Sequence, residues 1–359
     1  MNFRDYFNIP SDICYLNSAG NGLLPARSLQ WRQDWQEQFF DAREDHRDKQ
    51  GEFLNTVRAK IATYFQAANS KVYLCPNFSF AYASLLDRLP TDREFLILEG
   101  EYPSIQYPLI ARKRKINSLA VHPEIEASIY EALRKNPRQV FVVSIVQYIT
   151  GLKLDIAFFQ QLKRDFPETL IIADGSQYLG TEPFDFDASG IDAMASSGYK
   201  WLCSGFGNGF LLLNKNLQQL LDANLEGIPR PTVDFWREKE VLDTFFEPGH
   251  IDTIAQGTLL STLSLFQEFN ETAIAEHIQA LSNSLYPQLE ERELVLPLIS
   301  QRKNKSSLIN IQVDPNLYPE LLQAGLKCFP RGSGIRIGLH LYNNESDIQT
   351  LIRIIDKIR

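Results

Sequence analysis

Short apolar runs alternate with amphipathic stretches from about residue 71 to residue 213, and this alternation constrains the fold more than any other feature. It is typical of βα units arranged around a mainly parallel sheet. The clearest strands are predicted at residues 95–98, 140–146, 170–173 and 210–213. The sequence therefore predicts an α/β fold in which the loops at the carboxyl ends of the strands are the place for a ligand.

The alternating pattern of strands and helices ends at the Pro/Gly-rich stretch 227–232. A long helical pattern at 253–285 is followed by strand-like runs at 308–313 and 335–341, which indicate a smaller α+β domain. At 359 residues the chain exceeds the size at which a single hydrophobic core usually stops growing. We expect a large domain at 15–250 and a small domain formed by 1–14 plus 251–359.

Charge and cysteine content argue against several classes of protein. A net charge of -8 without a concentrated basic face disfavours nucleic-acid binding. The four cysteines lie far apart and no clustered histidines complete a metal site, so we expect no bound metal and reduced, mostly buried thiols. The amino terminus does not resemble a signal peptide, and no apolar run is long enough for a membrane helix. We expect a cytoplasmic protein with no membrane partner.

The stretch 171–213 carries the residues that suggest chemistry. A buried-type strand ends at Asp174, Gln177 follows three residues later, and the run Ser-Ser-Gly-Tyr-Lys ends at Lys200. A pyridoxal cofactor needs a lysine for its aldehyde and a carboxylate that keeps its ring nitrogen protonated, because the protonated ring is the electron sink for a carbanion. Asp174 and Lys200 supply that pair.

Other interpretations of this stretch are weaker. An aspartate at a strand end is by itself more often a cap or turn residue, so the prediction depends on its combination with Lys200. The glycines at 205–209 do not indicate a dinucleotide site, because that fingerprint joins a strand to a helix, whereas residues 210–213 have the pattern of a strand.

These motifs together resemble the class V aminotransferase family of fold-type I pyridoxal-phosphate enzymes, which includes cysteine desulfurases, selenocysteine lyases, isopenicillin-N epimerases and kynureninases. Besides the Asp174–Lys200 stretch, segments at 15–20, 101–104 and 336–343 resemble family segments in the expected order. The resemblance implies a fold-type I PLP-dependent transferase, with a mainly parallel sheet flanked by helices and a smaller α+β C-terminal domain.

The resemblance also implies a role for each matched residue. Lys200 is similar to the catalytic lysine that forms a Schiff base with pyridoxal 5'-phosphate, and Asp174 to the catalytic partner of the pyridine nitrogen. Gln177 resembles the group that hydrogen-bonds the cofactor's phenolic oxygen. Tyr102 occupies the place of the aromatic ring that stacks on the cofactor, although it could instead be a packing residue.

The remaining matches concern the phosphate and the substrate. Arg336 resembles the arginine that binds the substrate carboxylate, although it could instead form a salt bridge in the small domain, and Asn21 is a further substrate-binding candidate. Thr258 resembles a phosphate-binding residue that the partner subunit contributes, which implies a homodimer with a shared active site. The residues expected at the phosphate in the same subunit are Phe78, Ser79, Ser197 and Tyr199.

Two features depart from the family pattern. Cysteine desulfurases carry a catalytic cysteine on a loop before the substrate-binding arginine, whereas here Cys328 lies in a stretch, 326–329, that resembles an ordinary short strand. We therefore expect no persulfide chemistry on the protein. Tyr199 replaces the usual histidine before the lysine, which leaves Lys200 itself as the general base and acid at the α-carbon.

Three functions follow from these expectations. The leading one is transamination of a small amino-acid substrate. The second is a lyase of the cysteine or selenocysteine lyase type, or kynureninase-like bond cleavage, without a catalytic cysteine. The third is a catalytically inactive, cofactor-binding homologue. The substrate side chain stays open, with Asn21, Gln147, Tyr148 and residues 229–236 as candidates for contacting it.

Overall fold

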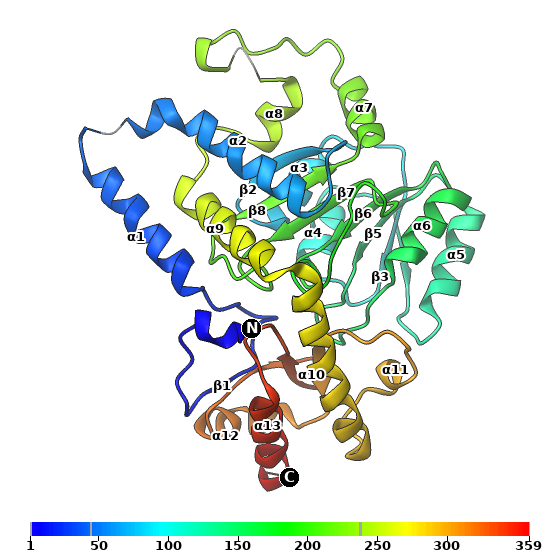
Figure 1. Cartoon of the computed structure of the whole chain (residues 1–359). Helices are drawn as coiled ribbons and strands as arrows, with labels where there is room; N and C mark the ends of the chain where they lie inside the picture. The colour runs from blue at the N-terminus through cyan, green and yellow to red at the C-terminus, as the bar shows by residue number, and fades with distance from the viewer. Residues whose placement is uncertain (1, 44, 237–238, 359) are drawn as a thin grey trace.

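A computed structural model describes residues 2–43, 45–236 and 239–358. Its upper part in Figure 1 holds a seven-stranded sheet in the order β2-β8-β7-β6-β5-β3-β4. β8 runs antiparallel to both of its neighbours, and the other adjacent pairs are parallel. The strands are β2 (Lys71–Cys75), β3 (Phe95–Leu98), β4 (Ile116–Leu119), β5 (Val140–Ser144), β6 (Leu170–Asp174), β7 (Ala193–Ser197) and β8 (Gly209–Leu213). The mainly parallel sheet predicted from the sequence is confirmed.

The helices connect these strands and extend into the lower part of the molecule. In chain order they are α1 (Ala26–Phe40), α2 (His46–Tyr64), α3 (Phe78–Leu86), α4 (Pro103–Ala111), α5 (Ile125–Lys135), α6 (Ile156–Asp165), α7 (Lys215–Asn224), α8 (Val241–Phe246), α9 (Thr253–Phe269), α10 (Glu271–Glu291), α11 (Pro297–Ser300), α12 (Tyr318–Gln323) and α13 (Glu345–Ile358). Short 3-10 turns lie at Phe3–Tyr6, Asp234–Trp236 and Pro315–Leu317.

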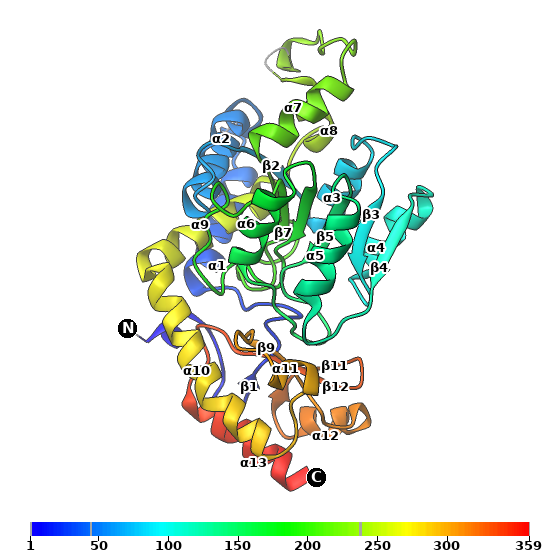
Figure 2. The same ribbon diagram turned by 90° about the vertical axis from the view of Figure 1, so that its right-hand side faces the viewer.

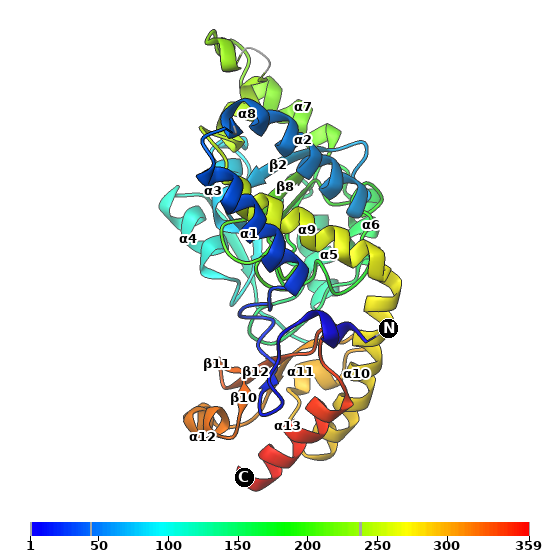
Figure 3. The ribbon, with the colours of Figure 1, turned by 60° about the vertical axis from the view of Figure 1, so that its left-hand side comes forward.

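The sheet is buried on both faces because helices cover each of them. Successive side chains of a strand point to opposite faces, and β2 sends Val72 and Leu74 into one apolar cluster and Tyr73 into the other. The first cluster includes side chains of α2, α5, α6 and α9, and the second includes those of α3, α4, α7 and α8. Figure 3 shows α1 and α2 lying beside α9.

All four strands predicted from the sequence are present, with small differences at their ends. The strand expected at 140–146 ends at Ser144. Three further strands, β2, β4 and β7, had not been singled out. β7 has the sequence Ala-Met-Ala-Ser-Ser, which lacks the β-branched and aromatic residues typical of strands. β4 is a half-exposed edge strand with two polar residues, so its apolar signal is weak.

Two smaller sheets form the core of the lower part of the molecule. One is antiparallel, in the order β11-β12-β9, and the other pairs β1 with β10 in parallel. Their strands are β1 (Cys14–Tyr15), β9 (Leu308–Ile311), β10 (Leu326–Lys327), β11 (Phe329–Arg331) and β12 (Gly334–Gly338). The prediction of one short strand at 326–329 is wrong, because Cys328 separates β10 from β11 and the two belong to different sheets.

The single helix predicted at 253–285 is two helices. The chain turns at Asn270, whose φ of 70° lies in the left-handed region, and α9 ends just before it. α10 then begins at Glu271, with the Asn270 side chain accepting a hydrogen bond from the backbone N–H of Thr272. α10 leads down into the lower part, where it packs against α13 (Figures 1 and 2).

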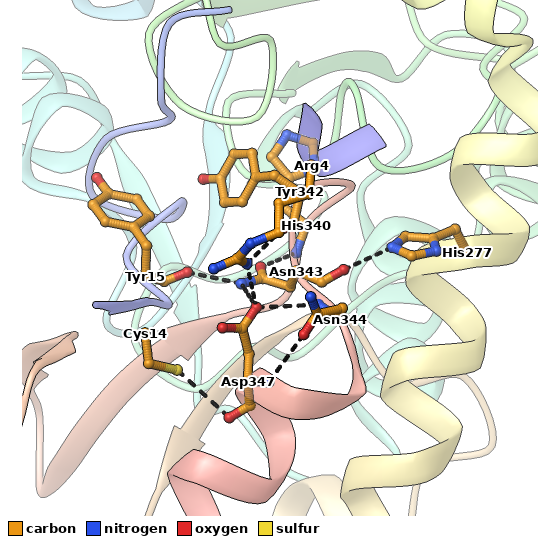
Figure 4. Close-up of polar contacts among 9 residues, drawn as sticks. All are labelled: Arg4, Cys14, Tyr15, His277, His340, Tyr342, Asn343, Asn344 and Asp347. Atoms are coloured by element: carbon orange, nitrogen blue, oxygen red, sulfur yellow. Dashed lines mark hydrogen bonds and ion pairs between the residues drawn. The ribbon is translucent and has the colours of Figure 1, made fainter. Parts of the chain in front are cut away.

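Polar contacts attach the amino-terminal segment to the carboxyl-terminal part (Figure 4). Asp347 of α13 accepts hydrogen bonds from Arg4, at 2.9 Å, and from the Asn343 side chain, at 3.1 Å. The same Asn343 amide donates to the carbonyl of Tyr15. His277 of α10 contacts the Asn343 carbonyl at 2.9 Å. Segments from both ends of the chain and from α10 therefore meet at this point.

We propose the domain division expected from the sequence, with 15–250 forming one domain and 1–14 plus 251–359 the other. The pairing of Cys14 with Leu326 and the Arg4–Asp347 ion pair support it. α9 is the element that joins the two parts, since it packs on α1 and α2 and continues into α10. No helix in the described ranges combines the length and apolar character needed to cross a membrane.

Candidate active site

Asp174 and Lys200 line the same cavity. Asp174 is the last residue of β6, and Lys200 follows three residues after the end of β7. β6 and β7 are adjacent and parallel, with Asp174 opposite Ala195, so their carboxyl ends lie together. The cavity has a volume of about 210 Å³ and is lined by Asn77, Phe78, Ser79, Tyr102, Asp174, Ser176, Ser197, Tyr199 and Lys200.

The two charged groups modify each other's ionisation. Asp174 is only 7% exposed, and burial raises the pKa of its carboxyl, while the charge of Lys200 and a 2.8 Å hydrogen bond from the Ser176 N–H act in the opposite direction. Burial lowers the pKa of Lys200 to about 8, and Asp174 opposes this shift. Lys200 therefore loses its proton more readily than an ordinary lysine, and its neutral amine is a nucleophile and a base.

Aromatic rings surround the lysine. The Lys200 Nζ lies 5.7 Å from the ring centre of Tyr102 and 5.6 Å from that of Tyr199. The Tyr102 ring packs edge-on against Tyr148, at 5.2 Å between ring centres. Burial raises the pKa of Tyr199, so its phenol stays protonated at neutral pH and can donate a hydrogen bond.

The amino terminus of α3 forms one wall of the cavity. Asn77 caps this helix by accepting the N–H of Phe80, and the Ser197 hydroxyl accepts the N–H of Phe78 at 3.0 Å. Ser79 occupies the first turn, where a backbone N–H has no partner within the helix, and its hydroxyl donates to Ser104 at 2.8 Å. The free N–H of Ser79, the hydroxyls and the helix dipole make this wall suitable for an anion such as phosphate.

Arg336 lies on β12, beyond the tyrosines that surround Lys200. It is 4% exposed, its Nη1 donates to the Tyr148 carbonyl at 2.9 Å, and its Nε is buried without a hydrogen-bond partner among the described residues. Burial lowers its pKa to about 10, and the nearby Arg331 charge adds to this shift. A buried guanidinium with an unused donor is suited to bind a carboxylate.

Besides Arg336, three residues predicted for the site do not line the cavity. Gln177 uses its amide to donate to the Ala19 carbonyl at 3.0 Å and to accept from the Trp201 indole at 2.7 Å. Asn21 is half-buried, and its carbonyl accepts the Tyr15 hydroxyl. The Gln177 arrangement does not follow from the local sequence, because Ala19 and Trp201 are far from Gln177 along the chain.

Thr258 also lies away from the cavity. It is 0% exposed within α9, where its hydroxyl donates to the Ile254 carbonyl at 2.6 Å and accepts from Arg32 at 3.1 Å. The neighbouring Gly257 packs directly under the Trp31 ring. The hydroxyl is therefore not presented at the surface, where a second subunit could use it.

Glu101 lies behind Asp174 and had not been assigned a role. It is 4% exposed and accepts hydrogen bonds from the N–H and the hydroxyl of Ser144, at 2.8 and 2.6 Å. Burial raises its pKa to about 7, and the charge of Asp174 makes a smaller contribution in the same direction. Its position beside Tyr102 in the segment 101–104 was the one available signal. Asn77 and Ser176 were missed as well, since nothing distinguishes them from ordinary turn residues.

All four cysteines are free and buried, as expected. Cys328, the candidate nearest to Arg336 in the sequence, is 2% exposed, and burial raises the pKa of its thiol to about 12. A buried thiol with this pKa is not a reactive thiolate at neutral pH.

A larger cavity, of about 660 Å³, lies between α2 and the segment that contains α8. Two of its carboxylates are already bound in ion pairs, Glu247 with Arg58 and Asp243 with Lys71. Among the described residues, no such ion pair engages Lys200 or Asp174 of the smaller cavity. The smaller cavity is therefore the better candidate for chemistry.

Comparisons with known proteins identify a family for the chain. The family model described as "Aminotransferase class-V" matches residues 14–351. No curated protein sequence matches the chain.

Among solved structures, similar folds include a C-DES variant with glycine covalently linked to its PLP cofactor, at 19% identity and a TM-score of 0.81, covering 98% of this chain and 99% of that one. A cysteine desulfurase from Thermococcus onnurineus has 15% identity and a TM-score of 0.81, covering 99% and 97%. Ureidoglycine-glyoxylate aminotransferase from Bacillus subtilis has 13% identity and a TM-score of 0.74, covering 98% and 93%. At these identities the likeness shows a shared fold.

Proposed function

The chain belongs to the class V aminotransferase family, and we propose that it is a pyridoxal 5'-phosphate enzyme that acts at the α-carbon of an amino acid. The observation that carries this proposal is the placement of Lys200 and Asp174 in one cavity, at the carboxyl ends of adjacent parallel strands. When bound, the cofactor supplies the electron sink that stabilises negative charge at the substrate α-carbon.

The residues present fit this cofactor. Lys200 supplies the amine for its aldehyde, and Asp174 supplies the buried carboxylate for its ring nitrogen. The first turn of α3, with Ser79, would hold the phosphate together with Ser197 and Tyr199. The Tyr102 ring lies 5.7 Å from the Lys200 amine, within reach of a ring bound there. Gln177, through Ala19 and Trp201, would keep the amino-terminal segment against the site.

Lys200 is the group we assign to proton transfer at the substrate α-carbon. It carries the one amine among the residues that line the cavity, and its lowered pKa, about 8, lets it both accept and return a proton near neutral pH. Arg336 would hold the substrate carboxylate through its unpartnered Nε. The phenols of Tyr102 and Tyr199 exclude water around the amine.

Transamination is the reaction that we place first. The same amine, carboxylate and arginine would also serve a lyase, and one structural neighbour is a cystine C–S lyase in complex with cysteine persulfide. The buried thiols argue against a variant of that chemistry in which sulfur passes to a protein cysteine. The second candidate is therefore bond cleavage without a catalytic cysteine.

We also infer a homodimer in the cytoplasm, as expected from the sequence. Phe206 is 68% exposed on the glycine-rich turn and contacts Tyr199 of the cavity, at 4.8 Å between ring centres. An exposed aromatic ring at the rim of a site is suited to be covered by a second copy. A monomer by analytical ultracentrifugation of the cofactor-bound protein would contradict the dimer.

Absorption spectroscopy tests the proposed function. We expect the purified protein to show a visible band from lysine-bound cofactor, and Lys200→Ala to lose it. Asp174→Asn should keep the band and reduce the rate of α-proton exchange by about 10²-fold or more, because the ring nitrogen loses its counter-charge. A band that survives in Lys200→Ala contradicts the assignment.

A panel of amino acids then separates the two reactions. Conversion to the pyridoxamine form, reversed by a 2-oxo acid, identifies transamination. Release of sulfide, alanine or pyruvate without that conversion identifies a lyase. Binding of the cofactor without turnover of any amino acid would identify an inactive homologue.

A further inference from the structure

The sheet face that carries Arg336 carries a second arginine. In the antiparallel pair β11–β12, Phe329 lies opposite Arg336, and Arg331 lies opposite Gly334. Residues directly opposite each other project to the same face, and so do residues two apart on one strand. Arg331, Phe329 and Arg336 therefore share a face, and the Arg331 guanidinium lies over the Phe329 ring at 4.7 Å. This contact holds the Arg331 guanidinium near Phe329, which is the residue that pairs with Arg336.

The turn that carries Arg331 is held against the loop that carries Tyr148. The side chain of Asn310 donates to the carbonyl of Arg331 at 2.8 Å and to that of Ile149 at 2.9 Å. A side chain at Gly332 would meet the Ile149 side chain at 2.6 Å, so the two segments are in direct contact. Arg331 is thus fixed beside the loop whose Tyr148 packs against Tyr102.

The charges of the two arginines act on the same groups, in agreement with this geometry. The positive charges of Arg336 and Arg331 each contribute to the lowered pKa of Lys200. Both also act on Tyr148, whose pKa they lower against the larger effect of burial. The placement itself rests on the strand pairing and on the contacts of the Arg331 turn with the loop at Ile149.

Neither arginine is neutralised by the protein. Within the described ranges, no carboxylate forms an ion pair with Arg331 or Arg336, and the Nε of Arg336 has no hydrogen-bond partner at all. Several other arginines of this chain are paired, as Arg302 is with Glu126. Arg336 is buried and Arg331 is exposed to solvent, so both can accept a ligand from outside. A ligand that reaches both guanidiniums is favoured when it carries two negative charges.

We propose that the substrate is an α-amino acid with a second anionic group on its side chain, with Arg336 binding the α-carboxylate and Arg331 the side-chain anion. The proposal rests on the proposed function, since it takes the cavity at Lys200 as the reaction site. It narrows the substrate to the acidic amino acids and their close analogues, and excludes apolar ones as preferred substrates.

Matched pairs of amino acids test this directly with the cofactor-bound enzyme. We expect kcat/KM for aspartate or glutamate to exceed that for asparagine or glutamine, which have the same shape without the charge. Arg331→Gln should lower the ratio of acidic to amide substrate by at least about tenfold, the effect of losing one hydrogen bond to a charged group, and Arg331→Lys should restore part of it. Arg353→Gln is the matched control, because Arg353 is also an exposed arginine but lies on α13, and it should leave the ratio unchanged.

A ratio near one in the wild type, or a ratio that Arg331→Gln does not alter, overturns the proposal. A variant that merely folds poorly would lose activity toward both members of a pair, so the ratio still decides. Calorimetric titration of the protein with succinate and, separately, with succinamate gives a readout independent of turnover, because the two ligands differ by one charge. We expect succinate to bind more tightly than succinamate, and we expect this difference in affinity to disappear in Arg331→Gln. Absence of the lysine-bound band or of all turnover would count against the proposed function, while equal binding of the two ligands would count against the second anion site alone.

Discussion

Two buried carboxylates near the cavity differ in what compensates their charge. Asp174 faces Lys200, whose positive charge opposes the effect of burial on the Asp174 pKa. Glu101 faces no cation and is held by the N–H and hydroxyl of Ser144. Its pKa of about 7 means that it is partly protonated at neutral pH. Hydrogen bonds alone therefore do not keep this buried carboxylate fully ionised.

Glu101 makes the stability of the protein depend on pH. Its pKa is raised on folding, from 4.5 to about 7, because the folded protein favours the neutral carboxyl. The free energy of unfolding therefore has the full benefit of the neutral form below pH 4.5, and this benefit is lost as the pH rises through about 7. Glu101→Gln should remove this loss and increase the free energy of unfolding at pH 8 by about 2 kcal/mol. Urea denaturation at pH 5 and pH 8 measures it.

The control is the same comparison at pH 5, where the variant and the wild type should differ much less. Gln keeps a carbonyl oxygen to accept from Ser144, so a simple loss of hydrogen bonding would destabilise the variant at both pH values. Destabilisation at pH 8 would show that Glu101 is ionised and needed in that form.

At the scale of elements, the turn between α9 and α10 sets the direction of the chain as it passes between the two parts of the molecule. Asn270 both takes the left-handed φ of 70° and caps α10. Asparagine suits both tasks, because it tolerates positive φ and its side-chain oxygen accepts a first-turn N–H. One residue therefore divides a continuous apolar pattern into two helices.

Asn270→Ala should lower the free energy of unfolding by about 1–2 kcal/mol, because alanine supplies no cap and is strained at positive φ. Asn270→Gly should cost only a few tenths of a kcal/mol, since glycine accepts this φ and is a tolerated cap. Thermal and urea unfolding of both variants give the comparison. Equal costs for the two variants would show that neither the cap nor the backbone conformation matters at this turn.

At the scale of the whole molecule, the amino-terminal segment closes over the site from the opposite end of the chain. Gly22 donates its N–H to the Tyr199 carbonyl at 2.8 Å and lies against the Lys200 carbonyl. Arg4 attaches the same segment to Asp347 (Figure 4). The position of Lys200 therefore depends on how the amino- and carboxyl-terminal regions are joined.

Gly22→Ala should disturb the site through the backbone. Its Cβ would lie 1.9 Å from the Lys200 carbonyl oxygen, so the segment must shift. We expect a loss of about 1–3 kcal/mol in the free energy of unfolding, together with weaker retention of the cofactor during dialysis. Gly51→Ala is the control: nothing lies within 4 Å of its Cβ and it falls inside α2, so it should stabilise the protein slightly. Normal stability and cofactor retention in Gly22→Ala would contradict this coupling.

The sequence by itself determined the α/β class, four strands of the large sheet, and the placement of Asp174 at the carboxyl end of its strand. These features are encoded locally: a buried strand is a contiguous apolar run, and parallel neighbours bring their carboxyl ends together. The tertiary structure alone decided that Lys200 joins Asp174 in one cavity, that Gln177 binds Ala19 and Trp201, that Thr258 is buried inside α9, and that Arg331 shares a sheet face with Arg336. Those outcomes depend on contacts between segments far apart in the chain, because burial and charge compensation are properties of the packed molecule and not of any stretch of it.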